Sequence, residues 1–524
     1  MHRCWVFRKP VRAIDGASPD VPRFALSLIV DAGGVGLTPS SALAHTYCDS
    51  GGFAATYHRV MVDLSVVLRD VADHVTAYRR GLDLTQVAPR STRAEIRAGM
   101  PGPVPYAGAS ATEVVAELIE RAGPGLMASA GPRYFGFVVG GSLDAALAAD
   151  MLACGWDQVA FNEALSPAAL AFEDVAGAWL KELLRLPMSA SAGFVTGAQA
   201  ANTVGLAAGR WKILQNRGWD VGTDGLFGAP PIRVVVGEER HATVDRSLRL
   251  LGIGEKAIVV VPARPDGAMD ASALRGILDL EPDAPTIVVA QSGNVNTGAF
   301  DDLARISDEA RRVDAWLHVD GAFGLWAAAS PALTHLVDGL EGADSWGCDG
   351  HKWLNVPYDS GYAFCAHPDV HATAMAYTAE YLTGQVVGRE FGGGDFVPES
   401  SRRARGFATW AALRALGRSG VADLIDRCCR LARRLAQDVG QIPGVEVVND
   451  VVLNQVLIRV GDTTFTNAVE RHIQQDGSVW LGGTVWRGQR LLRVAVSNCE
   501  TTEEDIGRAV QAIDQAVDEL RRVV

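Results

Sequence analysis

Four short apolar runs, each rich in β-branched residues, most constrain the fold of this chain. Each run has the length of one strand and is apolar on both faces, which is typical of strands buried in a parallel sheet. Segments with a 3.6-residue apolar period, such as DASALRGILDL and FDDLARISDEARRV, lie between them. The alternation predicts a three-layer α/β domain over residues 131–375. The runs are IRVVV at 232–236, AIVVV at 257–261, TIVVA at 286–290 and AWLHV at 315–319.

The length of 524 residues exceeds one ordinary core, so further structural units are expected. Residues 61–130 predict a helical N-terminal segment joined by Pro/Gly-rich linkers. Residues 376–524 predict a smaller α+β domain with a long helix, three strands and a closing helix that begins near Thr502. Residues 1–60 have no steady period, and we interpret them as an extension that is disordered or precedes the true start of translation.

The net charge of −13 argues against a nucleic-acid or anionic-membrane partner, because both require a basic surface. No apolar run approaches the roughly 20 residues of a membrane-spanning helix. The cysteines have no paired spacing, and Cys428 and Cys429 are adjacent, which suits neither a disulfide framework nor a zinc site. We therefore expect free thiols, no bound metal and a reducing cytoplasmic location.

Several polar groups follow the predicted strands directly. The segment TGAQAAN, from Thr196 to Asn202, lies between a short apolar run and a helix. Its backbone N–H groups at Gly197, Ala198 and Gln199 are placed to bind a phosphate at a helix N-terminus. The alternative is a tight strand-to-helix turn without a ligand.

His241 and Asn294 also follow strands, and ligands of open parallel sheets bind beyond the carboxyl ends of strands. His241 is placed to stack on a flat cofactor ring, and a helix-capping or surface histidine is the alternative. Asn294 offers an amide to a cofactor oxygen, and ordinary turn chemistry is the alternative.

Asp320 and Lys352 are the most informative pair. Asp320 ends the apolar run AWLHV, where a carboxylate is costly unless it has a partner. Lys352 lies in DGHKW, beside His351 and Trp353, where partial desolvation suits imine chemistry. A pyridoxal phosphate (PLP) enzyme needs a lysine that holds the aldehyde as a Schiff base and a carboxylate that keeps the pyridine nitrogen protonated. Taken singly, each residue has an ordinary structural explanation, but their order at successive strand ends predicts a PLP site.

Two motifs resemble the group II PLP-dependent decarboxylases, which include aromatic amino acid, glutamate, histidine and diaminobutyrate enzymes. These are the HVD-x-A element at 318–322 and the D-x-HKW element at 349–353. The resemblance covers roughly residues 61–524 and includes the segments NEALSPAALAFEDVAGAW and PRYFGF. It implies fold type I, the aspartate aminotransferase-like fold, with a mostly parallel seven-stranded sheet and a small C-terminal domain.

The chain departs from the family pattern at two places. Ala198 and Gln199 stand where the family often has Ser or Thr. Asn294 and Val295 replace a frequent Thr-Thr pair, so the partner of the cofactor 3′-oxygen is open.

The resemblance also implies roles for individual residues. The implied roles are Lys352 as the Schiff-base lysine, Asp320 as the ring-nitrogen partner, His241 as the stacking residue, Ala322 beneath the ring, His351 near the phosphate, Tyr134 and Phe135 as walls of the substrate pocket, and Tyr381 as a proton donor on a loop.

The implied activity is decarboxylation of an L-amino acid to CO₂ and an amine, with Tyr381 or His241 protonating the carbanion. Alternatives on the same fold are aldolase or other C–C lyase chemistry, oxidative deamination to an aldehyde, transamination, or PLP binding without turnover. The resemblance further implies a homodimer with interlocking N-terminal helices. The amphipathic stretch 61–85 fits such a swapped element, and packing within one subunit is the alternative. The sequence does not identify the substrate.

Overall fold

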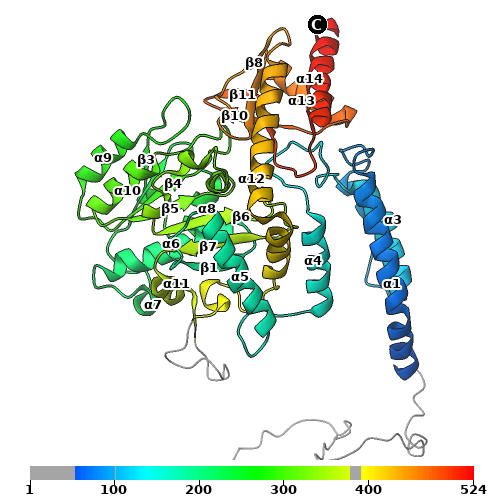
Figure 1. Ribbon diagram of the computed structural model, residues 1–524, viewed down its shortest axis with the longest axis horizontal. Helices are drawn as coiled ribbons and strands as arrows, with labels where there is room; N and C mark the ends of the chain where they lie inside the picture. Colours follow the sequence, from blue (N-terminus) through cyan, green and yellow to red (C-terminus); the bar gives the residue numbers. More distant parts are fainter. Residues whose placement is uncertain (1–52, 101, 378–390, 524) are drawn as a thin grey trace, which may run out of the picture. The chain divides into compact units, whose positions relative to one another are not determined.

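A seven-stranded mixed sheet holds the largest core of the protein (Figure 1). Its strands are β1 Ser191–Val195, β2 Arg233–Gly237, β3 Ile258–Val261, β4 Thr286–Gln291, β5 Trp316–Asp320, β6 Ser345–Asp349 and β7 Gly361–Cys365. They lie in the order β1-β7-β6-β5-β4-β2-β3. Strands β2 to β6 pair in parallel, whereas β7 is antiparallel to both neighbours, β1 and β6. The mostly parallel seven-stranded sheet predicted from the sequence is confirmed.

The computed structural model describes residues 53–100, 102–377 and 391–523. Residues 1–52 of the predicted extension at 1–60 lie outside the described residues, and so does Tyr381. From Asp63 onward the chain forms one compact unit. The domain bounds at 61–130, 131–375 and 376–524 stay predictions.

The four apolar runs form β2, β3, β4 and β5, as predicted. Burial on both faces holds for β2, β4 and β5 but not for β3, in which Val260 is 44% exposed. The reason is topological: β3 is the edge strand, so only one neighbour and fewer helices cover it.

Helices cover both faces of the sheet, and the alternation of side chains along β2 separates the two layers. Val234 and Val236 pack with Leu206 and Leu248 on one face, whereas Val235 packs in the core on the opposite face. The helices of this region are α4 Asp144–Trp156, α5 Pro167–Leu183, α6 Ala198–Gln215, α7 Val221–Asp224, α8 Ala242–Leu250, α9 Ala271–Leu280, α10 Leu303–Arg312 and α11 Pro368–Met375. The three-layer α/β arrangement is therefore confirmed.

Two glycines let α6 approach the sheet closely. A Cβ atom at Gly205 would lie 2.6 Å from the His318 ring, and one at Gly209 would lie 2.6 Å from the Trp316 ring. Because the two glycines are four residues apart, they face the same side of the helix. The helix therefore rests directly on β5.

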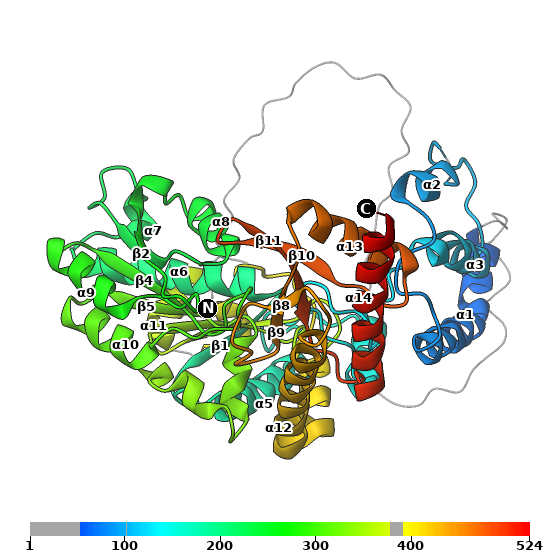
Figure 2. The same cartoon turned by 90° about the horizontal axis from the view of Figure 1, so that it is seen from above.

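A second sheet of four antiparallel strands, in the order β10-β11-β9-β8, follows in the chain. Its strands are β8 Val445–Val447, β9 Gln455–Val460, β10 Gly482–Trp486 and β11 Gln489–Ala495, and the helices are α12 Gly406–Val439, α13 Thr463–Asp476 and α14 Glu503–Val523. Helix α13 packs against β10 and β11, and α14 packs against α12 and α13 (Figure 2). The sequence predicted three of these strands and the helices α12 and α14, but not β10 or α13. Helix α14 begins with the predicted cap, because Thr502 and Asp505 hydrogen bond reciprocally.

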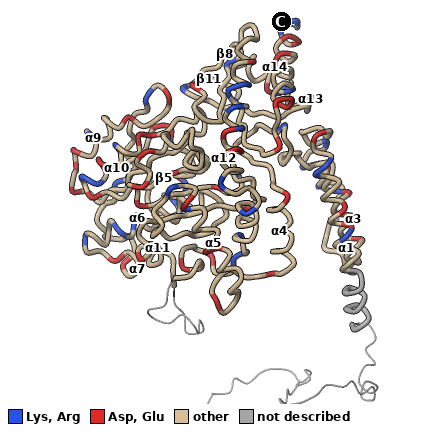
Figure 3. The backbone as a smooth tube through the Cα atoms, viewed as in Figure 1, with Lys and Arg blue, Asp and Glu red and all other residues tan. Residues whose placement is uncertain are grey.

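The N-terminal segment is helical, with α1 Phe53–Gly81, α2 Arg93–Ala98 and α3 Ala111–Ala122. Figure 3 shows Lys and Arg intermixed with Asp and Glu along the described elements. Within the described residues, no helix combines the length and apolar character that a membrane crossing requires.

Candidate active site

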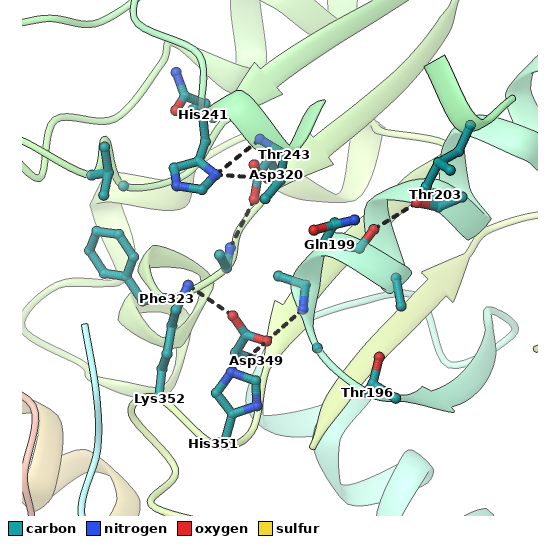
Figure 4. A pocket seen from close by; sticks show the side chains of 18 of the residues that line it. Thr196, Gln199, Thr203, His241, Thr243, Asp320, Phe323, Asp349, His351 and Lys352 are labelled. Atoms are coloured by element: carbon teal, nitrogen blue, oxygen red, sulfur yellow. Dashed lines mark hydrogen bonds and ion pairs between the residues drawn. The ribbon is translucent and has the colours of Figure 1, made fainter. Parts of the chain in front are cut away.

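A cavity of about 540 Å³ lies beyond the carboxyl ends of β4, β5 and β6 (Figure 4). Most of the predicted site residues reach it from different elements. Those that line it are Gly197, Ala198, Gln199, His241, Asp320, Ala322, His351 and Lys352. Parallel strands place their carboxyl ends at one edge of a sheet, so residues far apart in sequence meet here.

The N-terminus of α6 forms one end of the cavity. Gly197 has no side chain that could cap the helix, and the first helical N–H, that of Ala198, donates to Asp349 Oδ1 instead. A Cβ atom at Gly197 would lie 2.9 Å from the His351 ring and 3.1 Å from Asp349 Oδ1. Only glycine leaves this approach to the helix terminus open.

Asp349, which the prediction did not include as a site residue, is the central group at this end. Its side chain is 3% exposed at the end of β6. Oδ1 accepts a 2.5 Å hydrogen bond from the Ala198 N–H, and Oδ2 lies 2.8 Å from Lys352 Nζ. The sequence signal was the acid within D-x-HKW at the end of a strand.

His351 completes this cluster as a neutral imidazole. Burial lowers its pKa. Nδ1 accepts a 3.3 Å hydrogen bond from the Ser360 N–H, so the proton of a neutral ring lies on Nε2, 3.3 Å from Asp349 Oδ1. The ring stacks on Tyr358, with 4.2 Å between centroids. Figure 4 shows Lys352, Asp349 and His351 together at one end of the cavity.

Asp320 lies toward the other end of the cavity. It is 5% exposed, and within the described residues it forms no ion pair with a cation. Burial raises its pKa, and the nearby charges of His241 and Lys352 offset part of that effect. Its Oδ1 accepts a 3.3 Å hydrogen bond from the Ala322 N–H. A buried carboxylate with this surrounding is ready to pair with a cation that enters the cavity.

His241 caps a helix, as the alternative interpretation expected, and it also lines the cavity; its stacking on a cofactor ring stays a prediction. It is the N-cap of α8, and its Nδ1 lies 2.7 Å from Thr243 Oγ1. Burial lowers the pKa of His241 more than the Asp320 charge raises it. The imidazole ring lines the cavity, with a flat face available for contact.

Arg493 is a second residue that the prediction missed. It lies on β11, and its Nη1 donates a 3.1 Å hydrogen bond to the carbonyl of Val295, which lines the cavity. Burial lowers its pKa, and its charge contributes to the lowered pKa of His241. No carboxylate of the described residues pairs with it. The only sequence signal was an arginine inside the apolar run LLRVAV.

Three predicted residues are not among those that line the cavity. Asn294 uses its side chain within the turn, because Oδ1 accepts from two backbone N–H groups and Nδ2 donates to the Glu239 carbonyl. Tyr134 stacks on Trp480 at 4.9 Å, and Phe135 is buried in the main core. Their cofactor and substrate contacts stay predictions.

The donor set of the cavity fits PLP. The glycine-lined helix terminus suits a phosphate, the unpaired buried carboxylate of Asp320 suits a protonated ring nitrogen, and the amine of Lys352 suits an aldehyde. The flat face of His241 suits a position against an aromatic ring.

Comparison with known proteins also points to a pyridoxal-dependent protein. Residues 95–460 match the pyridoxal-dependent decarboxylase conserved domain. The 4-hydroxyphenylacetaldehyde synthase of Rhodiola rosea is 26% identical, covering 87% of this chain and 96% of the relative. The aromatic-L-amino-acid decarboxylase of Sus scrofa is 28% identical, covering 82% of this chain and 90% of the relative.

A solved structure shares the fold. The crystal structure of Oryza sativa TDC with PLP and tryptamine is 24% identical and superposes with a TM-score of 0.82, over 87% of this chain and 98% of that chain. The fold is therefore the predicted fold type I, with a small antiparallel C-terminal sheet. The domain match spans most of the chain, and by that match the chain belongs to the pyridoxal-dependent decarboxylase family.

Proposed function

We propose that this protein binds PLP and removes the α-carboxylate of an L-amino acid, giving CO₂ and an amine. The observation that carries the proposal is the convergence of Lys352, Asp320 and the N-terminus of α6 on one cavity. Bound PLP supplies the electron sink for the electrons released when the bond between Cα and the carboxylate breaks.

Each residue of the cavity has a distinct task in this proposal. Lys352 would bond to the cofactor aldehyde. Asp320 would pair with a protonated ring nitrogen, because a nearby carboxylate favours the charged pyridine. The residues that would hold the rest of the cofactor are Gly197, Ala198, Gln199 and His351 for the phosphate, Ala322 and His241 for the ring, and Asn294 for the 3′-oxygen.

Arg493 supplies a fixed positive charge beside the cavity, and we assign it to the substrate carboxylate. Its lack of a carboxylate partner among the described residues supports this assignment. A charge-assisted pair with the substrate fixes the amino acid before reaction. Tyr381 or His241 then delivers a proton to the substrate Cα, and Tyr134 and Phe135 are assigned to the walls that contact the side chain.

Aldehyde formation is the second candidate, since the Rhodiola rosea relative is an aldehyde synthase and is 26% identical. Tyr381 is the discriminating residue, because a proton donor at the substrate Cα favours the amine. Aldolase, other C–C lyase and transaminase activities have no comparable support from the two relatives named above. We further propose a homodimer, in which the N-terminal helices of the two chains interlock.

The test is a spectral titration of the purified protein with PLP, followed by a screen of L-amino acids for CO₂, amine, aldehyde and peroxide. We expect a coloured complex and release of CO₂ with an amine from at least one amino acid. The Lys352→Ala variant should lose turnover and should not retain the cofactor after borohydride reduction. A coloured protein that releases no CO₂ from any amino acid would contradict decarboxylation, and a variant that still fixes the cofactor would contradict the role of Lys352.

A further inference from the structure

A chain of buried polar side chains joins β5 and β6 to helix α6. Trp316 Nε1 donates a 2.9 Å hydrogen bond to Ser345 Oγ, which lies 2.8 Å from His318 Nδ1. His318 Nε2 lies 3.0 Å from Asn202 Oδ1. Ser345, His318 and Asn202 are each 0% exposed, and none of the four side chains lines the cavity. We call these four side chains the relay.

The donors and acceptors of the relay follow from its two ends. An amide oxygen only accepts, so His318 donates from Nε2 to Asn202 Oδ1. Burial lowers the pKa of His318 to about 3, so the ring is neutral and its Nδ1 accepts from the Ser345 hydroxyl. That hydroxyl in turn accepts from the indole of Trp316, which can only donate. Every hydrogen bond of the relay therefore has a fixed direction, from Trp316 to Asn202.

The opposite orientation of the Asn202 amide is unfavourable. It would make Nε2 of His318 an acceptor, so that Nδ1 would have to donate to Ser345. The Ser345 hydroxyl would then accept two hydrogen bonds and find no acceptor for its own proton among the described residues. A buried donor without an acceptor is costly. The relay therefore fixes Oδ1 of Asn202 toward His318, and Nδ2 on the opposite branch of the amide.

Asn202 Nδ2 is the one donor of the relay that is left over. It is buried and forms no hydrogen bond of ordinary geometry with the described residues. Asp320 pairs in register with Gly347, and a Cβ atom at Gly347 would collide with Asn202 Oδ1, so the amide lies against this strand pair. Burial raises the pKa of Asp320, and the Asn202 side chain is among the groups that offset part of that effect. Asp320 is thus the acceptor within reach of Nδ2.

We propose that Asn202 is a positioning residue for Asp320: the relay turns an amide N–H toward the carboxylate, which leaves Asp320 as the acceptor of a hydrogen bond from the ring nitrogen of a bound cofactor. A carboxylate that already receives N–H donors is a weaker base, so a shared proton stays on the ring nitrogen. Asp320 Oδ1 also accepts from the Ala322 N–H, which acts in the same direction. This role rests on the proposed function, because it takes the PLP ring to lie against Asp320.

The test compares the full-length wild-type protein with Asn202→Leu, which removes the amide and keeps a side chain of similar size. The probes are pyridoxamine 5′-phosphate, which lacks the aldehyde that bonds to Lys352, and its analogue with carbon in place of the ring nitrogen. Calorimetric titration gives both dissociation constants, and nitrogen NMR of ligand labelled at the ring nitrogen reports its protonation. The wild-type preference for nitrogen over carbon should fall about tenfold in Asn202→Leu, and the labelled nitrogen should shift toward its neutral form.

Thr466→Val is the matched control. Thr466 is also 0% exposed, and its hydroxyl donates to the Val460 carbonyl near the second sheet. Deleting this buried hydrogen bond should leave the preference for nitrogen within about twofold of wild type, because it does not touch the relay. A general effect of losing a buried polar group would instead lower the preference in both variants, and that result would overturn the role of Asn202.

Other outcomes also decide the role of Asn202. Equal weakening of both ligands in Asn202→Leu, with the labelled nitrogen unchanged, would show a packing role alone and overturn the proposal. A neutral ring nitrogen in the wild-type complex would do the same. If Asn202→Leu does not fold, Ser345→Ala interrupts the relay farther from the cavity and should lower the preference about threefold, whereas an unchanged preference contradicts the relay. A wild-type protein that binds neither ligand nor PLP would contradict the proposed function instead.

Discussion

At the scale of single residues, two titratable groups beside the cavity form no ion pair with an oppositely charged group among the described residues. Asp320 is buried and lines the cavity, where burial raises its pKa, and Arg493 is partly buried and adjoins the cavity as a cation. A buried unpaired charge is expensive, so such groups persist where a ligand completes them. A protonated ring nitrogen would bring the positive charge that complements Asp320. A substrate carboxylate would bring the negative charge that complements Arg493.

The role of Arg493 can be tested by Arg493→Met. Loss of a charge-assisted hydrogen bond contributes about 1.5 to 3 kcal/mol, so kcat/KM for the amino acid should fall about 10- to 100-fold. Inhibition by the product amine, which has no carboxylate, should stay within about threefold of wild type, because the two ligands differ only at the group that Arg493 binds. Arg490→Met is the matched control, since Arg490 lies on the same strand and pairs with Glu470 instead. Equal losses for substrate and amine would contradict the assignment.

The sequence singled out polar residues after the predicted strands, and several of them line one cavity; their roles stay predictions. Lys352 and Asp320 follow strands, so topology alone brings them to one edge. The turn bonds of Asn294 agree with the turn chemistry that the sequence offered as the alternative, and its contact with a cofactor stays a prediction. Arg493 comes from the second sheet, and no spacing rule connects that sheet to the cavity.

At the scale of elements, a buried ion pair joins α5 to the segment before α12. Glu173 and Arg402 form two hydrogen bonds of 2.6 Å, and their side chains are 2% and 1% exposed. Burial raises the pKa of Glu173, and the Arg402 charge offsets part of that effect. A pair this deeply buried fixes the two elements relative to each other, but it stabilises the fold only while both partners are present.

The Arg402→Met variant should therefore lose about 3 to 5 kcal/mol in free energy of unfolding, because Glu173 would remain as an unpaired buried charge. The double variant Arg402→Met, Glu173→Met should recover most of that loss. Denaturant unfolding of the three proteins with saturating cofactor gives the comparison. A single variant as stable as wild type, or a double variant that is no more stable than the single one, would contradict this account.

Helices with a clear 3.6-residue apolar period and strands rich in β-branched residues could be predicted from the sequence. Short strands of mixed composition could not. The strands β6 and β7 contain Gly, Cys and Tyr, and they form because neighbouring strands already provide the sheet. Helix α12 was predicted as continuous, yet Gly417 adopts a positive φ of 62° within it. Only glycine takes this conformation easily, so the glycine permits the break in the helix but does not by itself predict one.

At the scale of the whole molecule, the N-terminal helices α2 and α3 present apolar side chains that no described residue covers fully. No residue of α2 or α3 is buried, and on α3 Val114 is 51% and Leu118 is 62% exposed. Amphipathic helices gain most of their stability from an apolar face that is packed. A second copy of the chain, as proposed above for the homodimer, would cover this face.

The double variant Val114→Glu, Leu118→Glu should shift the protein from dimer to monomer in sedimentation velocity experiments. Two charges buried in an apolar interface cost far more than the contacts they replace. The control is Glu120→Gln, on the same helix at an exposed position, which should leave the dimer intact. If the double variant sediments as wild type does, α3 lies outside the interface, and if the wild-type protein is monomeric the proposed homodimer is wrong.

The two glycines of α6 have a consequence for how the chain tolerates sequence change. Gly205 and Gly209 set the height of the helix above β5, and the first residues of the same helix, Ala198 and Gln199, line the cavity. Adding one methyl group at either glycine would lift or tilt the whole helix of 18 residues, about five turns. Substitutions far from any ligand would then be selected against through the binding of the cofactor, before the stability of the fold itself was lost.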